Sequence, residues 1–183
     1  FFRVPVAWIS VLSFGISLYH SVMVLRTGSE EHDLGAEVSA RLGLWFCVLA
    51  TVSGAIFAKS AWNMYWNWDP RETSIVVLLM IYMAYFGLRS ALPDPDRRSR
   101  LAAVYAVMAF FVMIFLVFVV PRMYMSLHPD TVINWKMENK ISDATIRIVL
   151  LASLAGFTGI YAWIYNLSAR IERMVRRKEN ADV

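Results

Sequence analysis

The segment LAAVYAVMAFFVMIFLVFVV, residues 101–120, is an apolar run without Asp, Glu, Lys or Arg. A helix of about 20 residues rises about 30 Å, which matches the hydrocarbon core of a bilayer. A membrane β-strand would alternate apolar and polar residues, and this run shows no such alternation. Leu101–Val120 is therefore predicted to be a transmembrane helix, which places the chain among integral membrane proteins.

Four further segments are apolar enough to cross a bilayer or nearly so: Val4–Leu25, Leu42–Ala58, Thr73–Leu88 and Ile148–Leu167. The second and third spans of the chain are short, and amphipathic flanks such as Ala36–Arg41 would lengthen them. Of the 183 residues, 58% are hydrophobic, which is too apolar for an ordinary soluble domain. We predict one all-α integral membrane domain, residues 1–183, with five transmembrane helices. Because Phe1 begins abruptly in apolar sequence, we expect a sixth span before it.

Basic residues predict which side of the membrane each connection faces. They crowd the connection after the third span (Arg89, Arg97, Arg98, Arg100) and the tail after the fifth (Arg170, Arg173, Arg176, Arg177, Lys178). The positive-inside rule places both clusters in the cytoplasm. Phe1–Arg3, Trp62–Glu72 and Pro121–Ser142 then share the outer side, where we expect the chemistry. The basic residues lie in two separate clusters and not along one stripe, so we expect no nucleic acid as a partner. We expect the chain to be surrounded by the lipid bilayer.

The predicted outer connection WNMYWNWDPRETS, residues 62–74, has an aromatic density that a membrane belt rarely needs. Its aromatic residues are Trp62, Tyr65, Trp66 and Trp68. Beside Asp69, these rings offer a wide stacking surface that suits a large planar ligand. An alternative is a short interfacial helix, because Trp62, Tyr65, Trp66 and Asp69 recur at helical spacing.

Asp69, Pro70 and Glu72 have the pattern of a helix start. Asp is a preferred N-cap, Pro suits the first helical position, and Glu two positions later closes a capping box. We therefore predict a helix that begins after Asp69, with Glu72 as the capping-box partner. This pattern accounts for both carboxylates but not for Trp68, which lies off the helical stripe.

His128, in the second outer connection, is the candidate metal ligand. Neutral imidazole is a common axial ligand to haem iron, although a lone loop histidine is more often simply solvated. His20 follows Arg3 by about 25 Å of helix and so lies near the opposite side of the membrane. His32 lies in an acidic cytoplasmic stretch, and we expect it to be a solvated connection residue.

The tryptophan-rich stretch resembles the signature of the haem-handling protein family. Within that family, the chain is similar to the haem exporter protein C type of cytochrome c maturation. Three segments carry the resemblance over nearly all 183 residues: Val4–Trp8, Trp62–Ser74 and Ser126–His128. The Asp69–Thr73 ending also resembles the larger cytochrome c synthetase members, whose span count exceeds that of this chain.

The resemblance implies six spans, both termini in the cytoplasm, and a place in a bacterial or archaeal inner membrane. It implies that haem b binds at the outer surface against the Trp-rich loop, between two axial histidines. His128 occupies the position of the second one. The implied partners are ABC transporter subunits, a small membrane subunit and a membrane-anchored haem chaperone. The implied role is haem handling rather than enzymatic catalysis, and any ATP hydrolysis would belong to a partner.

The first family histidine would immediately precede Val4, where this chain has Arg3. A guanidinium has no lone pair for iron, but its planar fork suits a haem propionate. Arg122 is the first choice for a propionate because it lies close to His128 in sequence, although lipid phosphates are an equal alternative for each cation. The other outward cations are Arg71, Lys136 and Lys140. Iron would be five-coordinate through His128 or take a sixth ligand from Met64, Met123, Tyr124 or Met125.

Two rival classes of function remain open at the level of sequence. One is a haem-containing subunit for electron transfer, and the other is a structural subunit whose Trp loop docks a partner without haem. No Ser/His/Asp set, paired-carboxylate site or phosphate-binding loop is visible, so we assign no catalytic residues.

Overall fold

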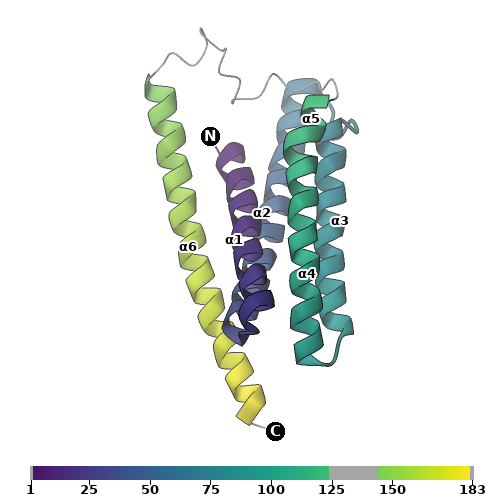
Figure 1. The fold of residues 1–183 in the computed structure, drawn as a ribbon. Helices are drawn as coiled ribbons and strands as arrows, with labels where there is room; N and C mark the ends of the chain where they lie inside the picture. Colours follow the sequence, from purple (N-terminus) through teal and green to yellow (C-terminus); the bar gives the residue numbers. More distant parts are fainter. Residues whose placement is uncertain (1, 124–143, 182–183) are drawn as a thin grey trace.

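The structure is a computed structural model that describes residues 2–123 and 144–181 (Figure 1). In chain order its helices are α1 (Arg3–Thr27), α2 (Glu30–Trp62), α3 (Pro70–Ala91), α4 (Pro95–Ile114), the π-helix η1 (Phe115–Val119), α5 (Val120–Met123) and α6 (Ala144–Ala181). Because α4, η1 and α5 follow one another without a break, they form one rod. The described residues contain no strand, and five helical segments are long and apolar enough to cross a membrane. The prediction of an all-α membrane protein with five spans is confirmed.

The helices extend beyond the apolar runs that predicted them. Only Gly28 and Ser29 separate α1 from α2, and α2 begins at Glu30, well before the predicted start at Leu42. Amphipathic sequence thus lengthens the short second span, as expected. Acidic residues in the first turn of α2 favour this early start, because they interact well with the positive end of the helix dipole.

A row of buried serines on α1 joins it to α2, its most extensive neighbour. The hydroxyls of Ser10, Ser13 and Ser17 donate to main-chain carbonyls of α2, to Gly43 at 3.0 Å, Ser39 at 2.7 Å and Ala36 at 2.9 Å. Small residues at such an interface let two helix backbones approach closely, which is the usual means of packing in lipid. The composition of this face therefore accounts for the close α1–α2 pair.

Phe14 connects this pair to α3. Its ring stacks on Tyr82 with centroids 3.7 Å apart, and both side chains are buried. The same ring lies against Gly43 of α2, where an added Cβ would lie 2.6 Å from a ring carbon. Phe14 is thus held between two helices in the core of the bundle.

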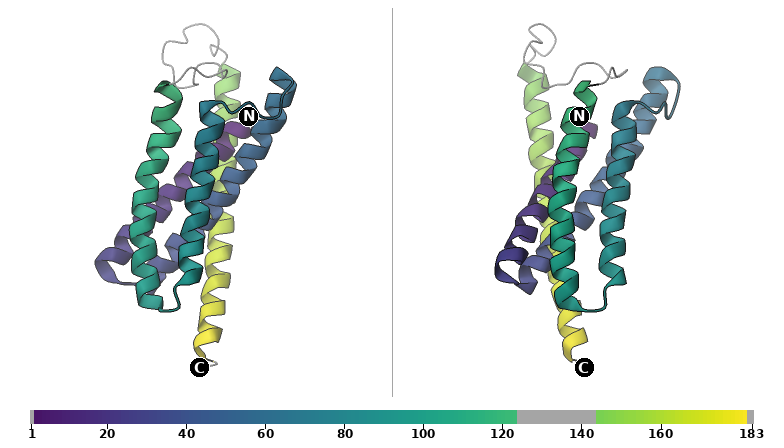
Figure 2. Two further views of the ribbon diagram at one scale, coloured as in Figure 1. Left: turned by 90° about the vertical axis from the view of Figure 1, so that its right-hand side faces the viewer. Right: turned by 45° about the vertical axis from the view of Figure 1, so that its right-hand side comes forward.

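Helix α6 stands at the edge of the bundle (Figures 1 and 2). Within the described residues it packs only against α1 and α2. One of its few buried groups is Tyr161, whose hydroxyl lies within hydrogen-bond distance of the Ser13 hydroxyl, at 3.2 Å. Trp163 on the same helix is 70% exposed, as suits a side chain that faces lipid.

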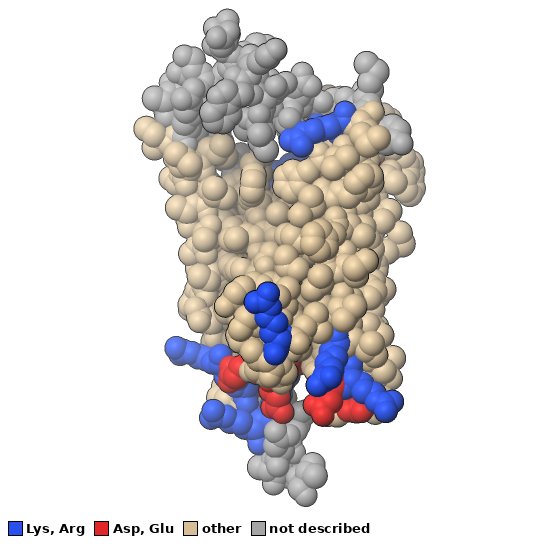
Figure 3. All heavy atoms as spheres, in the orientation of Figure 1, with Lys and Arg blue, Asp and Glu red and all other residues tan. Residues whose placement is uncertain are grey.

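Charged side chains gather at the two ends of the molecule, with a broad uncharged belt between them (Figure 3). We call one end the loop end: it carries the start of α1, residues 63–69 and Met123 (Figure 1). The other, the basic end, carries the α1–α2 and α3–α4 connections and the C-terminal part of α6 (Figures 1 and 2). The described parts of the three predicted outer segments thus meet at one end.

Candidate functional site

The connection between α2 and α3, residues 63–69, is an irregular loop. Asn63 and Trp68 have left-handed backbones, with φ of 58° and 57°. Lys59 holds the end of α2 by donating to the main-chain and side-chain oxygens of Asn63, at 3.1 and 3.0 Å. The alternative of a short interfacial helix over residues 62–69 is therefore wrong, because only Trp62 is helical and belongs to α2.

The start of α3 holds the other end of the loop. Asp69 is buried and accepts a hydrogen bond from the Arg71 backbone N–H at 2.9 Å, and Pro70 is the first helical residue. The predicted N-cap is thus confirmed. The predicted capping box is wrong: Glu72 accepts from the backbone N–H of Asn67 at 3.0 Å. The Asp69 N–H instead donates to the Asn67 side chain at 3.2 Å, because the turn at Trp68 folds Asn67 back onto the helix.

The aromatic side chains of this loop differ in exposure. Tyr65 is 61% exposed and Trp68 is 70% exposed, whereas Trp66 is half-buried. The Trp66 and Trp68 rings meet edge to face, with centroids 5.8 Å apart and planes at 86°. One of these two rings can therefore lie flat against a planar ligand while the other meets it at an angle. The side chain of Trp62 lies outside the described part of the structure.

Cations from two helices lie at the loop end. Arg3, half-buried at the start of α1, places its Cζ atom 5.5 Å from the centroid of the Phe57 ring on α2. Arg71, in the first turn of α3, lies at the same end of the bundle and close enough for its charge to act on Arg3. The Nε atom of Arg71 is buried without a hydrogen-bond partner among the described residues. A buried donor without an acceptor is costly, so this position suits an anionic group.

The remaining predicted residues lie after the fourth span. Arg122 and Met123 are exposed on α5, which packs against α3 and so reaches the loop end. His128, the predicted iron ligand, lies outside the described residues. The same holds for Tyr124, Met125, Lys136 and Lys140.

An apolar cavity of about 170 Å³ opens between α1, α2, α3 and η1. Its lining includes Trp8 and Val11 from α1, Cys47 from α2, Ile75 from α3 and Phe118 from η1. Trp8 and Ile75 lie one to two turns from the loop end of their helices. Sequence reasoning missed this cavity, because it forms only where four helices meet beside the π-helical turn.

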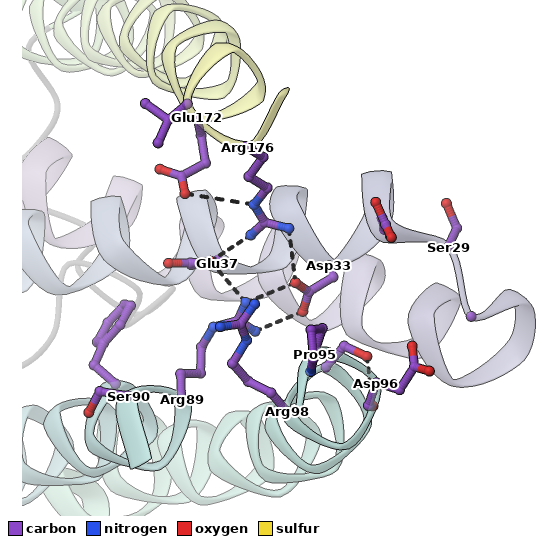
Figure 4. Close-up of a pocket in the computed structure, with 15 residues that line it drawn as sticks. Ser29, Asp33, Glu37, Arg89, Ser90, Pro95, Asp96, Arg98, Glu172 and Arg176 are labelled. Atoms are coloured by element: carbon purple, nitrogen blue, oxygen red, sulfur yellow. Dashed lines mark hydrogen bonds and ion pairs between the residues drawn. The ribbon is translucent and has the colours of Figure 1, made fainter. Parts of the chain in front are cut away.

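A larger cavity, of about 560 Å³, lies at the basic end beside a network of ion pairs (Figure 4). Arg89 of α3 binds Asp33 of α2 through two hydrogen bonds, of 2.7 and 2.8 Å, and Glu37 at 2.8 Å. Arg176 of α6 reaches the same two carboxylates at 3.3 and 2.9 Å. These opposite charges neutralise one another. Because the ion pairs join α2, α3 and α6, we call this network the clamp. The prediction had treated Arg89 only as a topology signal.

The prediction for His32 is wrong. His32 belongs to α2 and is half-buried, and its Nδ1 atom lies 3.1 Å from Nδ1 of His20. Because α2 starts so early, the stretch expected to be a connection is folded against α1. His20 lies far from the loop end, as expected.

Comparison with known proteins identifies the family of this chain. The family model described as heme exporter protein C matches residues 1–183. The "Heme exporter protein C" of Bradyrhizobium diazoefficiens is 30% identical over 97% of this chain and 66% of its own length. That of Rhodobacter capsulatus is 27% identical over 96% of this chain and 72% of its own. A "Cytochrome c biogenesis protein CcsA" of Prochlorococcus marinus strain MIT 9303 is 35% identical over 50% of this chain and 28% of its own length. The chain belongs to the heme exporter protein C family.

Proposed function

We propose that this chain binds haem b at its loop end and presents it to a membrane-anchored haem chaperone during cytochrome c biogenesis. The observation that carries the proposal is an exposed aromatic loop whose two ends are held by hydrogen bonds. The family match and the name of the Bradyrhizobium diazoefficiens relative support haem as the cargo, and the name of the Prochlorococcus marinus relative supports a place in cytochrome c biogenesis. In this proposal the loop end faces the outside of a bacterial or archaeal cytoplasmic membrane.

The residues at the loop end fit a planar, anionic cargo. Trp68 offers an exposed aromatic ring to the porphyrin, and Tyr65 is a second exposed ring of the same loop. The orphaned Nε of Arg71, with Arg3 nearby, suits a propionate, while Arg122 is available on α5. Haem supplies the iron, for which His128 is the proposed axial ligand.

This proposal does not assign the sixth ligand of the haem iron, because Arg3 stands where the family has a histidine. Met64 is 49% exposed in the Trp loop and Met123 is 66% exposed at the end of α5. Either thioether can ligate haem iron. A weak sixth ligand would suit a carrier that must release its cargo.

The proposed mechanism is presentation, without a bond-making step by this chain. The loop holds the porphyrin face, and cations orient the propionates. An exposed loop leaves the cargo accessible to a chaperone, and ABC transporter subunits with a small membrane subunit would be further partners. The energy of ATP, where it is used, would enter through those partners.

The test is the absorption spectrum of protein purified from cells with ample haem. Wild-type protein should show a Soret band that is lost or shifted in His128→Ala. Trp68→Ala should lower haem affinity roughly fivefold, as expected for the loss of about 1 kcal/mol of stacking. Trp163→Ala is the matched control, because that ring is equally exposed but lies on α6 away from the loop end.

Two outcomes would point to the rival functions. Wild-type protein without haem would contradict the proposal and favour a structural subunit whose loop docks a partner. Reversible cycling of bound haem with soluble electron donors and acceptors would favour an electron-transfer subunit.

A further inference from the structure

His20, His32 and Tyr165 form a cluster between three helices at the basic end, separate from the proposed haem site. The Nδ1 atoms of His20 on α1 and His32 on α2 lie 3.1 Å apart. The Tyr165 hydroxyl on α6 lies 3.2 Å from Nε2 of His20. Both ring nitrogens of His20 therefore have a partner, and one of these partners is another imidazole.

The backbone of α2 is shaped to receive the His20 ring. Gly35 lies one turn after His32, and a Cβ atom at Gly35 would be 2.8 Å from ring atoms of His20. Only a glycine lets the imidazole lie this close to the helix, where it reaches His32. Tyr19 packs against both histidine rings from the side, with centroids at 5.4 and 6.5 Å.

The separation of the two nitrogens matches a shared metal ion. Two imidazole nitrogens bound at about 2.0–2.1 Å to one ion, with an angle of about 100° at the metal, lie roughly 3.1 Å apart. If His20 donates its Nε2–H to Tyr165, its Nδ1 lone pair points toward His32. Such an outer hydrogen bond orients a ligating histidine and raises its basicity.

We propose that His20 and His32 bind a transition-metal ion of the kind that prefers imidazole, such as Cu²⁺ or Zn²⁺. Without metal, one Nδ1–H donates to the other Nδ1. On binding, His32 carries its proton on Nε2 instead, so both Nδ1 lone pairs face the ion and no net proton is released. Among the described residues no group of three His, Cys, Asp or Glu side chains could hold a metal ion, so water would complete the coordination. Both histidines are half-buried, so neither side chain is sealed inside the bundle.

Two charged groups beside the cluster are paired with each other. Glu31 of α2 and Arg173 of α6 form an ion pair at 3.0 Å. This pair ties the same helices together just beyond the cluster. A metal ion bound by His20 and His32 would add a link between α1 and α2 at this end.

The experiment is a titration with Cu²⁺ of the full chain in nanodiscs, purified on a tag without histidines. Electron paramagnetic resonance should show one tightly bound Cu²⁺ with imidazole coordination, and the melting temperature should rise. His32→Gln should weaken binding at least about tenfold, and Tyr165→Phe, which keeps both imidazoles, should weaken it by no more than that.

The variants in this test must keep the fold, so that weaker Cu²⁺ binding reports the loss of a ligand and not unfolding. His32 lies in the first turn of α2, so His32→Gln should leave the fold intact. His128→Ala should retain this Cu²⁺ site, because His128 belongs to the proposed haem site. Equal binding by wild type and His32→Gln would overturn the proposal, as would loss of the Cu²⁺ signal in His128→Ala alone. Absence of Cu²⁺ from the wild type would leave a hydrogen-bonded histidine pair and would likewise overturn it.

Discussion

Arg89 and Asp33 form a two-pronged ion pair, with nitrogen–oxygen distances of 2.7 and 2.8 Å, between side chains that are only 7% and 6% exposed. The residues are 56 positions apart in sequence, so the pair exists only because α3 packs beside α2. Because both charges are buried in an apolar bundle, loss of either side chain would leave the other charge unpaired and would lower the stability of the fold. Arg176 adds a third helix to this contact.

Arg89→Met should destabilise the protein by about 3 kcal/mol, because it leaves the Asp33 carboxylate buried with only the longer contact to Arg176. The measurement is equilibrium unfolding in detergent micelles. Arg97→Met is the matched control. Its pair with Asp94 has side chains 80% and 48% exposed, so its loss should cost less than about 1 kcal/mol. Equal effects of the two substitutions would contradict the assignment of Arg89 as a clamp.

Asp69→Ala should lower both stability and haem retention. The N-cap hydrogen bond to Arg71 contributes about 1 kcal/mol, and its loss frees the end of the Trp loop. Asp94→Ala removes the equivalent N-cap of α4, which accepts from the Asp96 N–H at 3.1 Å. Both substitutions should lower the stability that is measured by unfolding, whereas only Asp69→Ala should lower the haem affinity that is measured by titration. A haem affinity lowered equally by both would mean that the cap acts through global stability alone.

Arg71→Gln should lower haem affinity severalfold, because it removes the cation whose Nε atom is buried without a partner among the described residues. Arg98→Gln is the control: its Nε atom is buried in the same way, but it lines the cavity at the basic end. Haem titration of both variants separates a propionate contact from a general effect of losing a buried guanidinium. An unchanged affinity in Arg71→Gln would exclude it as a propionate ligand.

Gly43→Ala should destabilise the protein by about 1–3 kcal/mol, because the new methyl group would meet the Phe14 ring, which cannot retreat from Tyr82. Gly87→Ala, on α3, meets nothing within 4 Å and should stabilise the helix by up to about 1 kcal/mol. Thermal unfolding of the two variants measures the difference in sign. A neutral Gly43→Ala would show that the α1–α2 contact is looser than described.

Much of the candidate site was predictable at the level of single segments. The N-cap at Asp69 follows from its own neighbours, as does the density of aromatic residues before it. The path of the loop was not predictable, because the hydrogen bond from Asn67 to Glu72 competes with the expected capping box. The perpendicular rings of Trp66 and Trp68 are a result of that path.

The sequence by itself determined the membrane class, the five membrane-spanning segments of the described residues and the end of the molecule where the α1–α2, α2–α3 and α3–α4 connections lie (Figure 1). These properties follow from local composition, since apolar runs of sufficient length must satisfy their backbone hydrogen bonds as helices in lipid. Only the tertiary structure decided that Arg89 is buried against Asp33, that His20 meets His32, and that an apolar cavity opens beside η1. Those contacts join residues from different helices, and their geometry depends on how closely small side chains let the helices pack.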